Sequence, residues 1–174
     1  MRSSDTDANQ FGTLFIDTTI TRYTRAEWDL LVRLPGRMVA AATSDETAGA
    51  RQSVIEALAG LNAIAAGRGS PNALVRQVVG TIYAELDLDS PSTRDVGNAD
   101  ETASFAPILD ACRQAAAILA DHGSEADRLA YEKWLESIAI GVCDASPMTG
   151  DVGATMMRLA TERYLLAELE DAFR

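Results

Sequence analysis

Most of this chain repeats Leu, Val, Ile and Ala at intervals of three or four residues, the spacing that gathers apolar side chains on one face of an α-helix. Hydrophobic residues make up 47% of the 174 residues, a fraction large enough to build a packed core. The pattern predicts an all-α, single-domain bundle of five or six helices. The expected helices cover residues 24–42, 45–66, 70–86, 104–120, 124–145 and 151–172.

The segments outside these helices have different patterns. Residues 1–12 are polar and aperiodic, so we expect a flexible tail ahead of a single helical domain spanning residues 13–174. Residues 13–21 are rich in β-branched side chains, which favours a short extended segment near the N-terminus. Residues 87–103 hold four aspartates, one proline and one glycine among few apolar residues, which predicts a long acidic loop.

Two helix starts and one interruption are predicted from local residue spacing. Thr24 followed by Glu27, and Ser124 followed by Asp127, have the spacing of a capping box, in which side chain and backbone bond reciprocally at a helix N-terminus. Pro35 lies inside the first apolar repeat. Because proline lacks an N–H and clashes with the preceding turn, a kink or a break is expected there.

The apolar repeats predict which face of each helix is buried. In the helix over residues 45–66 the large side chains follow one stripe, and we expect that stripe to face the core. It comprises Val54, Leu58, Leu61 and Ala65, widened by Ile55 and Ile64. The corresponding residues elsewhere include Trp28, Leu31, Val32, Met38 and Val39 in the first helix, Tyr131, Trp134, Leu135, Ile138 and Val142 in the fifth, and Leu166, Leu169 and Phe173 in the sixth.

The charge balance excludes several classes of partner. The formal net charge is -11 and the sequence pI is about 4.4, so nucleic acid phosphates and anionic lipid surfaces repel the chain. No apolar run is long enough to span a bilayer. We therefore expect a cytoplasmic protein that binds neither nucleic acid nor membranes.

No residue pattern predicts a catalytic site. His122 is the one histidine of the chain and stands at a predicted helix end, where it suits the helix dipole as a cap. Cys112 and Cys143 have no metal-type spacing and are expected to be buried reduced thiols. The sequence predicts no cofactor, and it favours a protein that is not an enzyme.

A carboxylate metal site is the one chemical alternative with named candidates. Glu56, Asp110 and Glu136 interrupt mainly apolar runs on three different predicted helices, and bundles can hold metals with such residues. Each of the three also fits a solvated helix flank. The sequence therefore leaves open a ferritin-like or other metal-binding bundle.

The absence of a catalytic constellation and the apolar helical faces favour an interaction or structural module, with a protein partner or with a second copy in a homodimer. Besides the metal-binding bundle, a binder of small apolar ligands stays an alternative. Residues 28–42 can also be aligned with residues 131–145, which would make the bundle two related helical hairpins. Any two amphipathic helices align in this way, so both interpretations stay open.

Overall fold

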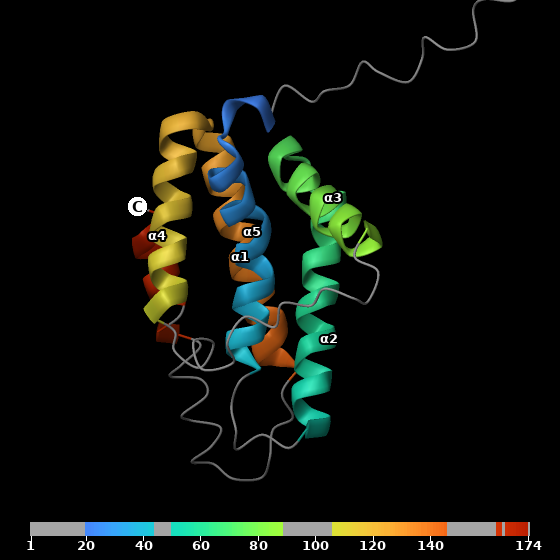
Figure 1. The fold of residues 1–174 in the computed structure, drawn as a ribbon. Coiled ribbons are helices and arrows are strands. Elements are labelled where there is room, and N and C mark those ends of the chain that lie inside the picture. The colour runs from blue at the N-terminus through green and yellow to red at the C-terminus, as the bar shows by residue number, and fades with distance from the viewer. Residues whose placement is uncertain (1–19, 44–49, 89–105, 146–162, 165, 174) are drawn as a thin grey trace, which may run out of the picture.

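The computed structural model describes residues 20–43, 50–88, 106–145, 163–164 and 166–173, and within them it contains helices and no strand (Figure 1). The predicted all-α class is therefore confirmed. The α-helices are α1 (Arg25–Ala42), α2 (Ala50–Ala66), α3 (Ala73–Leu88), α4 (Ala106–His122) and α5 (Glu125–Asp144), with 3-10 turns η1 (Ile20–Arg22) and η2 (Gly67–Gly69). Residues 163–164 and 166–172 are also helical.

Helix α5 occupies the middle of the bundle together with α1. Figure 1 shows α4 on one side of this pair and the consecutive helices α2 and α3 on the other. Helix α5 contacts each of α1, α2, α3 and α4, and α1 likewise contacts each of the other four helices. The C-terminal helical residues reach the same core, because the rings of Phe173 and Tyr131 lie 6.3 Å apart between centroids.

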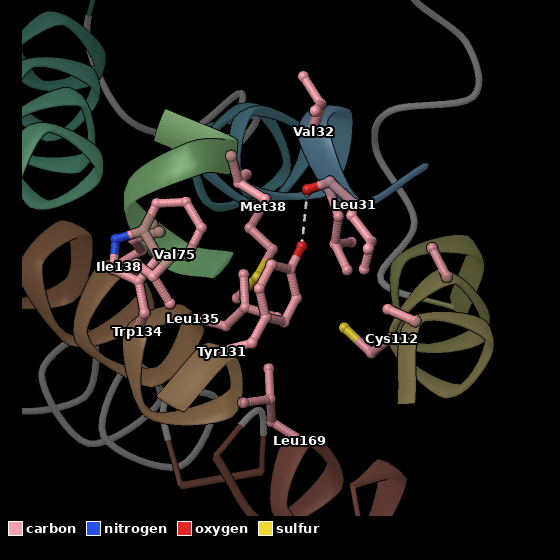
Figure 2. Packing of buried hydrophobic residues seen from close by; sticks show 14 of the residues in the cluster. Leu31, Val32, Met38, Val75, Cys112, Tyr131, Trp134, Leu135, Ile138 and Leu169 are labelled. Atoms are coloured by element: carbon pink, nitrogen blue, oxygen red, sulfur yellow. Dashed lines mark hydrogen bonds between the residues drawn. The ribbon is translucent and has the colours of Figure 1, made fainter. Parts of the chain in front are cut away.

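The buried side chains form one cluster to which α1, α3, α4, α5 and the C-terminal residues contribute large apolar groups (Figure 2). The predicted inward faces of α1 and α5 are confirmed, since Leu31, Tyr131 and Ile138 are fully buried. Leu169 and Phe173 are buried as predicted too. Helix α2 differs from the other helices, because Ile64 is its one large apolar member of this cluster.

Both predicted capping boxes are present. The Glu27 amide donates to Thr24 Oγ1 at 3.3 Å, and the Thr24 amide donates to Glu27 Oε2 at 2.7 Å. At α5 the Asp127 amide donates to Ser124 Oγ, and the Ser124 amide donates to Asp127 Oδ2. These bonds satisfy backbone donors that have no partner within the helix, and they fix where α1 and α5 begin.

Of the kink or break expected at Pro35, the break is wrong, because α1 runs through this residue from Arg25 to Ala42. A proline in a helix leaves the carbonyl four residues earlier without its backbone donor, and here that carbonyl belongs to Leu31. The hydroxyl of Tyr131 donates to Leu31 O at 2.7 Å (Figure 2). Burial holds the pKa of Tyr131 well above its ordinary value, so the hydroxyl keeps the proton that it donates. A side chain from α5 thus replaces the hydrogen bond that Pro35 removes.

The predictions for the segments outside the helices are only partly tested by the described residues. Ile20 and Thr21, at the end of the expected extended segment, lie in the 3-10 turn η1 instead. The predicted loop over residues 87–103 starts later, since α3 reaches Leu88; the tail over residues 1–12 and most of the loop lie outside the described residues. Within the described part of the chain, no helix has the length and apolar character needed to cross a membrane.

Candidate interaction surface

Helix α2 has two different apolar faces. The face toward the bundle is built from small residues with two exceptions: Glu56, Gly60 and Ile64 are buried, and Ala57 and Ala63 are half-buried. The opposite face carries the large aliphatic side chains. Val54 is 57% exposed, Leu58 56% and Leu61 50%, and Ile55 beside them is 42% exposed. We call these four residues the outer stripe of α2.

The outer stripe overturns the predicted orientation of this helix. The periodicity places Val54, Leu58 and Leu61 in the core, whereas they face solvent among the described residues. Of the six residues predicted to be buried, Ile64 is in the core at 2% exposure and Ala65 is half-buried. The helix is therefore rotated so that its smallest side chains, rather than its largest, meet α1 and α5.

The physical reason is the close approach of α2 to its neighbours at Gly60. A Cβ built on Gly60 would lie 2.6 Å from Val39 Cγ2 of α1 and 2.9 Å from Val142 Cγ2 of α5. On the facing helix, a Cβ on Gly141 would lie 3.3 Å from the Cβ of Ala63. There is no space in this contact for a leucine, so burying Leu58 or Leu61 here would push the helices apart and open gaps in the core.

One polar contact fixes α2 against α5 in this orientation. The indole N–H of Trp134 donates to the carbonyl of Ala63 at 3.4 Å, near the C-terminal end of α2. Trp134 itself is 6% exposed. The indole thus fills the space left by the small residues of α2 and satisfies its own donor there.

The outer stripe itself contains no charged residue, and Arg51 lies one turn before Val54 in the same helix. Between residues 52 and 66 the one charged residue is Glu56, and it is 5% exposed on the inner face. The other exposed large hydrophobic side chains of α3, α5 and the C-terminal helical residues are single residues that do not form a row with another: Leu86 beside Glu85, Leu129 beside Arg128, Ile140 one turn from Asp144, and Tyr164 beside Arg163. A row of exposed apolar side chains on one helix face is typical of a binding surface.

The predicted metal candidates do not converge. Glu56 is buried on α2, Asp110 is exposed on α4 and pairs with Arg113 at 2.8 Å, and Glu136 is half-buried on α5. In the described residues, no group of three or more His, Cys, Asp or Glu side chains is arranged to hold a metal ion.

Glu136 has a different neighbour, the nearly buried Glu132, which is 9% exposed. Burial, and then the charges of Glu136 and Glu170, raise the pKa of Glu132, while Arg128 and Lys133 oppose the rise. Glu132 and Glu136 therefore repel each other along α5, and Glu170 extends this repulsion to the C-terminal helical residues.

His122 is the last residue of α4, as expected, and it faces a second helix terminus. Its Nε2 lies 3.4 Å from Glu27 Oε1, and its ring meets the ring of Tyr23 edge-on at 6.1 Å between centroids. The hydrogen bonds from Thr24 hold the pKa of Glu27 below its ordinary value, and the proximity of His122 adds to this effect. Glu27 thus caps α1 and ties it to the end of α4.

Asp127 likewise caps α5 and ties its N-terminus to Asn72, the residue before α3. The Nδ2 of Asn72 donates to Asp127 Oδ1 at 2.8 Å. Burial alone would raise the pKa of Asp127, but the hydrogen bonds from Asn72 and Ser124 outweigh it and hold the pKa below its ordinary value. The polar groups at this end of the bundle are engaged in joining helix termini to one another.

The predicted burial of the thiols is confirmed for Cys112 but not for Cys143. Cys112 is buried and Cys143 is half-buried, and neither forms a disulfide. Burial raises the pKa of the Cys112 thiol to about 11, so at neutral pH it is the protonated, weakly nucleophilic form.

Comparison with protein-family models, curated proteins and solved structures finds no significant match to this chain.

Residue size is a misleading guide to burial in α2, and for this reason the sequence pattern does not predict the outer stripe. The usable signal is the recurrence of Ala57, Gly60, Ala63 and Gly67 at helical spacing, which marks a close helix–helix contact.

Proposed function

We propose that this protein acts as an interaction module that binds the apolar face of a helix from another polypeptide against the outer stripe of α2. The observation that carries the proposal is the exposure of Val54, Leu58 and Leu61, at 57%, 56% and 50%, on a helix whose opposite face is packed. Exposing large aliphatic side chains to water is unfavourable by about 25 cal/mol per Å² of apolar surface, and a partner helix removes that cost.

The spacing of the outer stripe suits this kind of partner. Val54, Leu58 and Leu61 stand at i, i+4 and i+7, the pattern by which one helix presents a row of side chains to another. The row extends about 10 Å along the helix axis, since Val54 and Leu61 are seven positions apart and each step rises about 1.5 Å. Binding of this kind needs no catalytic group.

A photo-crosslinking residue in place of Leu58 tests the proposal. The benzoylphenylalanine side chain at this position, irradiated in host cells, should give a discrete crosslinked product. The matched control carries the same residue in place of Leu86, which is 61% exposed on α3 beside Glu85. A discrete product from position 58 alone supports the proposal. No product from position 58, or the same products from both positions, would contradict it.

A further inference from the structure

We propose that the polypeptide bound by the outer stripe is a second copy of this chain, with two α2 helices crossing antiparallel about a two-fold axis near Leu58. This inference rests on the proposed function and names its partner. It makes the protein a homodimer whose interface is one helix from each copy. Two-fold dimers of this type use the same patch on both subunits.

Charge is the first argument. With a net charge of -11, two copies of this chain repel each other over most of their surfaces. The outer stripe is the exception, because the one acidic residue of α2, Glu56, is 5% exposed on the inner face, and the other charged residue of the helix, Arg51 before Val54, is basic. Two copies can therefore come into contact at this face without placing like charges opposite one another.

The sequence of the stripe supplies the second argument. A two-fold axis requires that the patch complement itself, and Leu58 stands near the midpoint of the row from Val54 to Leu61. Antiparallel crossing there places Val54 opposite the partner's Leu61 and Leu58 close to the partner's Leu58. Every large side chain of the row then meets an apolar counterpart.

The other exposed apolar side chains do not offer such a site. Leu86, Leu129 and Tyr164 are single residues with a charged neighbour in the sequence. A second copy placed on any of them would bring charged residues into the contact, where desolvation is costly. The self-association surface is therefore confined to α2 within the described residues.

Sedimentation of the purified full chain tests the inference. The wild-type protein should sediment as a concentration-dependent dimer with twice the 18.6 kDa mass of the chain, and Leu58→Asp should sediment as the monomer. Leu86→Asp is the matched control, because it adds the same charge at an equally exposed position, and it should remain dimeric. Circular dichroism checks that both variants stay helical. Added salt should raise the dimer fraction, because it screens the net negative charge without weakening an apolar contact.

The outcomes separate this inference from the proposed function. A monomeric wild-type protein that crosslinks through position 58 only in host cells would overturn self-association and leave a different partner on the outer stripe. A dimer that Leu58→Asp does not dissociate, or one that salt dissociates, would place the contact elsewhere and overturn the inference. No crosslink through position 58, either in cells or with the purified protein, would overturn both proposals.

Discussion

Helices α2 and α5 pack against each other and use their apolar residues in opposite ways. Helix α5 buries its large side chains, with Tyr131, Leu135 and Ile138 fully enclosed. Helix α2 turns Leu58 and Leu61 outward and packs through Gly60 and its alanines. The contrast shows that a central helix can bury large side chains on several sides. A helix that approaches two neighbours closely has room only for small residues at the contact.

The largest effect on stability should come from removing a large buried side chain of α5 at its contact with α2. Trp134→Ala should lower the free energy of unfolding by about 3–5 kcal/mol, because the indole is buried and its loss leaves a cavity. Leu61→Ala on the outer stripe should change it by less than about 0.5 kcal/mol, because the side chain is half exposed. Urea unfolding of the monomeric Leu58→Asp background separates folding from association. Similar losses for both variants would end the contrast between the two helices.

The bond between α5 and α1 should give the next largest effect. Tyr131→Phe should cost about 1–3 kcal/mol, because it leaves the buried Leu31 carbonyl without a donor. Pro35→Ala restores a backbone N–H to that carbonyl. Tyr131→Phe should therefore cost less in the Pro35→Ala background, which a double-mutant cycle measures as a coupling energy. Additive costs would show that the hydroxyl does not replace the bond that Pro35 removes.

A single methyl group tests the small-residue face of α2. Gly60→Ala should destabilise by about 1–3 kcal/mol, because the new Cβ overlaps Val39 and Val142. Gly80→Ala in α3 is the matched control, since a Cβ there meets nothing within 4 Å. That variant should gain about 0.5–1 kcal/mol from helix propensity alone. If thermal unfolding shows both variants stabilised, α2 is not held as close to α1 and α5 as described.

The smallest effects on stability should come from two carboxylates, Glu27 of α1 and Glu132 of α5. The outer stripe of α2 has no such group. The pKa of Glu27 is lowered in the folded protein, so its ionised form stabilises the fold, and this contribution is lost as the pH falls through the lowered pKa. The pKa of Glu132 is raised, so its ionised form destabilises the fold above the ordinary value of 4.5. At neutral pH, Glu27→Gln should therefore lower the melting temperature and Glu132→Gln should raise it.

The pH dependence gives each of these variants its own control. The difference between Glu132→Gln and wild type should disappear as the pH falls well below 4.5, where the carboxyl becomes protonated in both the folded and the unfolded chain. The difference for Glu27→Gln should persist to lower pH, because its pKa is lowered in the folded protein. If both variants shift the melting temperature in the same direction at neutral pH, the pKa values of Glu27 and Glu132 are not displaced in opposite directions.

Local sequence patterns determined the helices and several of their ends. The capping boxes at Thr24 and Ser124 were predictable because they involve residues three positions apart. The inward faces of α1 and α5 were predictable because a helix near the middle of a bundle buries its largest apolar side chains. His122 was expected at a helix end, and α4 ends there.

Only the tertiary structure decided the continuity of α1 and the orientation of α2. The helix continues through Pro35 because Tyr131, a residue of α5, supplies a hydrogen bond that no local pattern contains. The local sequence around each of Glu56, Asp110 and Glu136 is compatible with a metal ligand. Whether the three carboxylates meet depends on how their three helices are placed, and they do not meet. The outer stripe faces away from the core because α1 and α5 leave no room at Gly60 for a larger side chain. Periodicity reveals that a helix has an apolar face, but the space between neighbouring helices determines which of two apolar faces is buried.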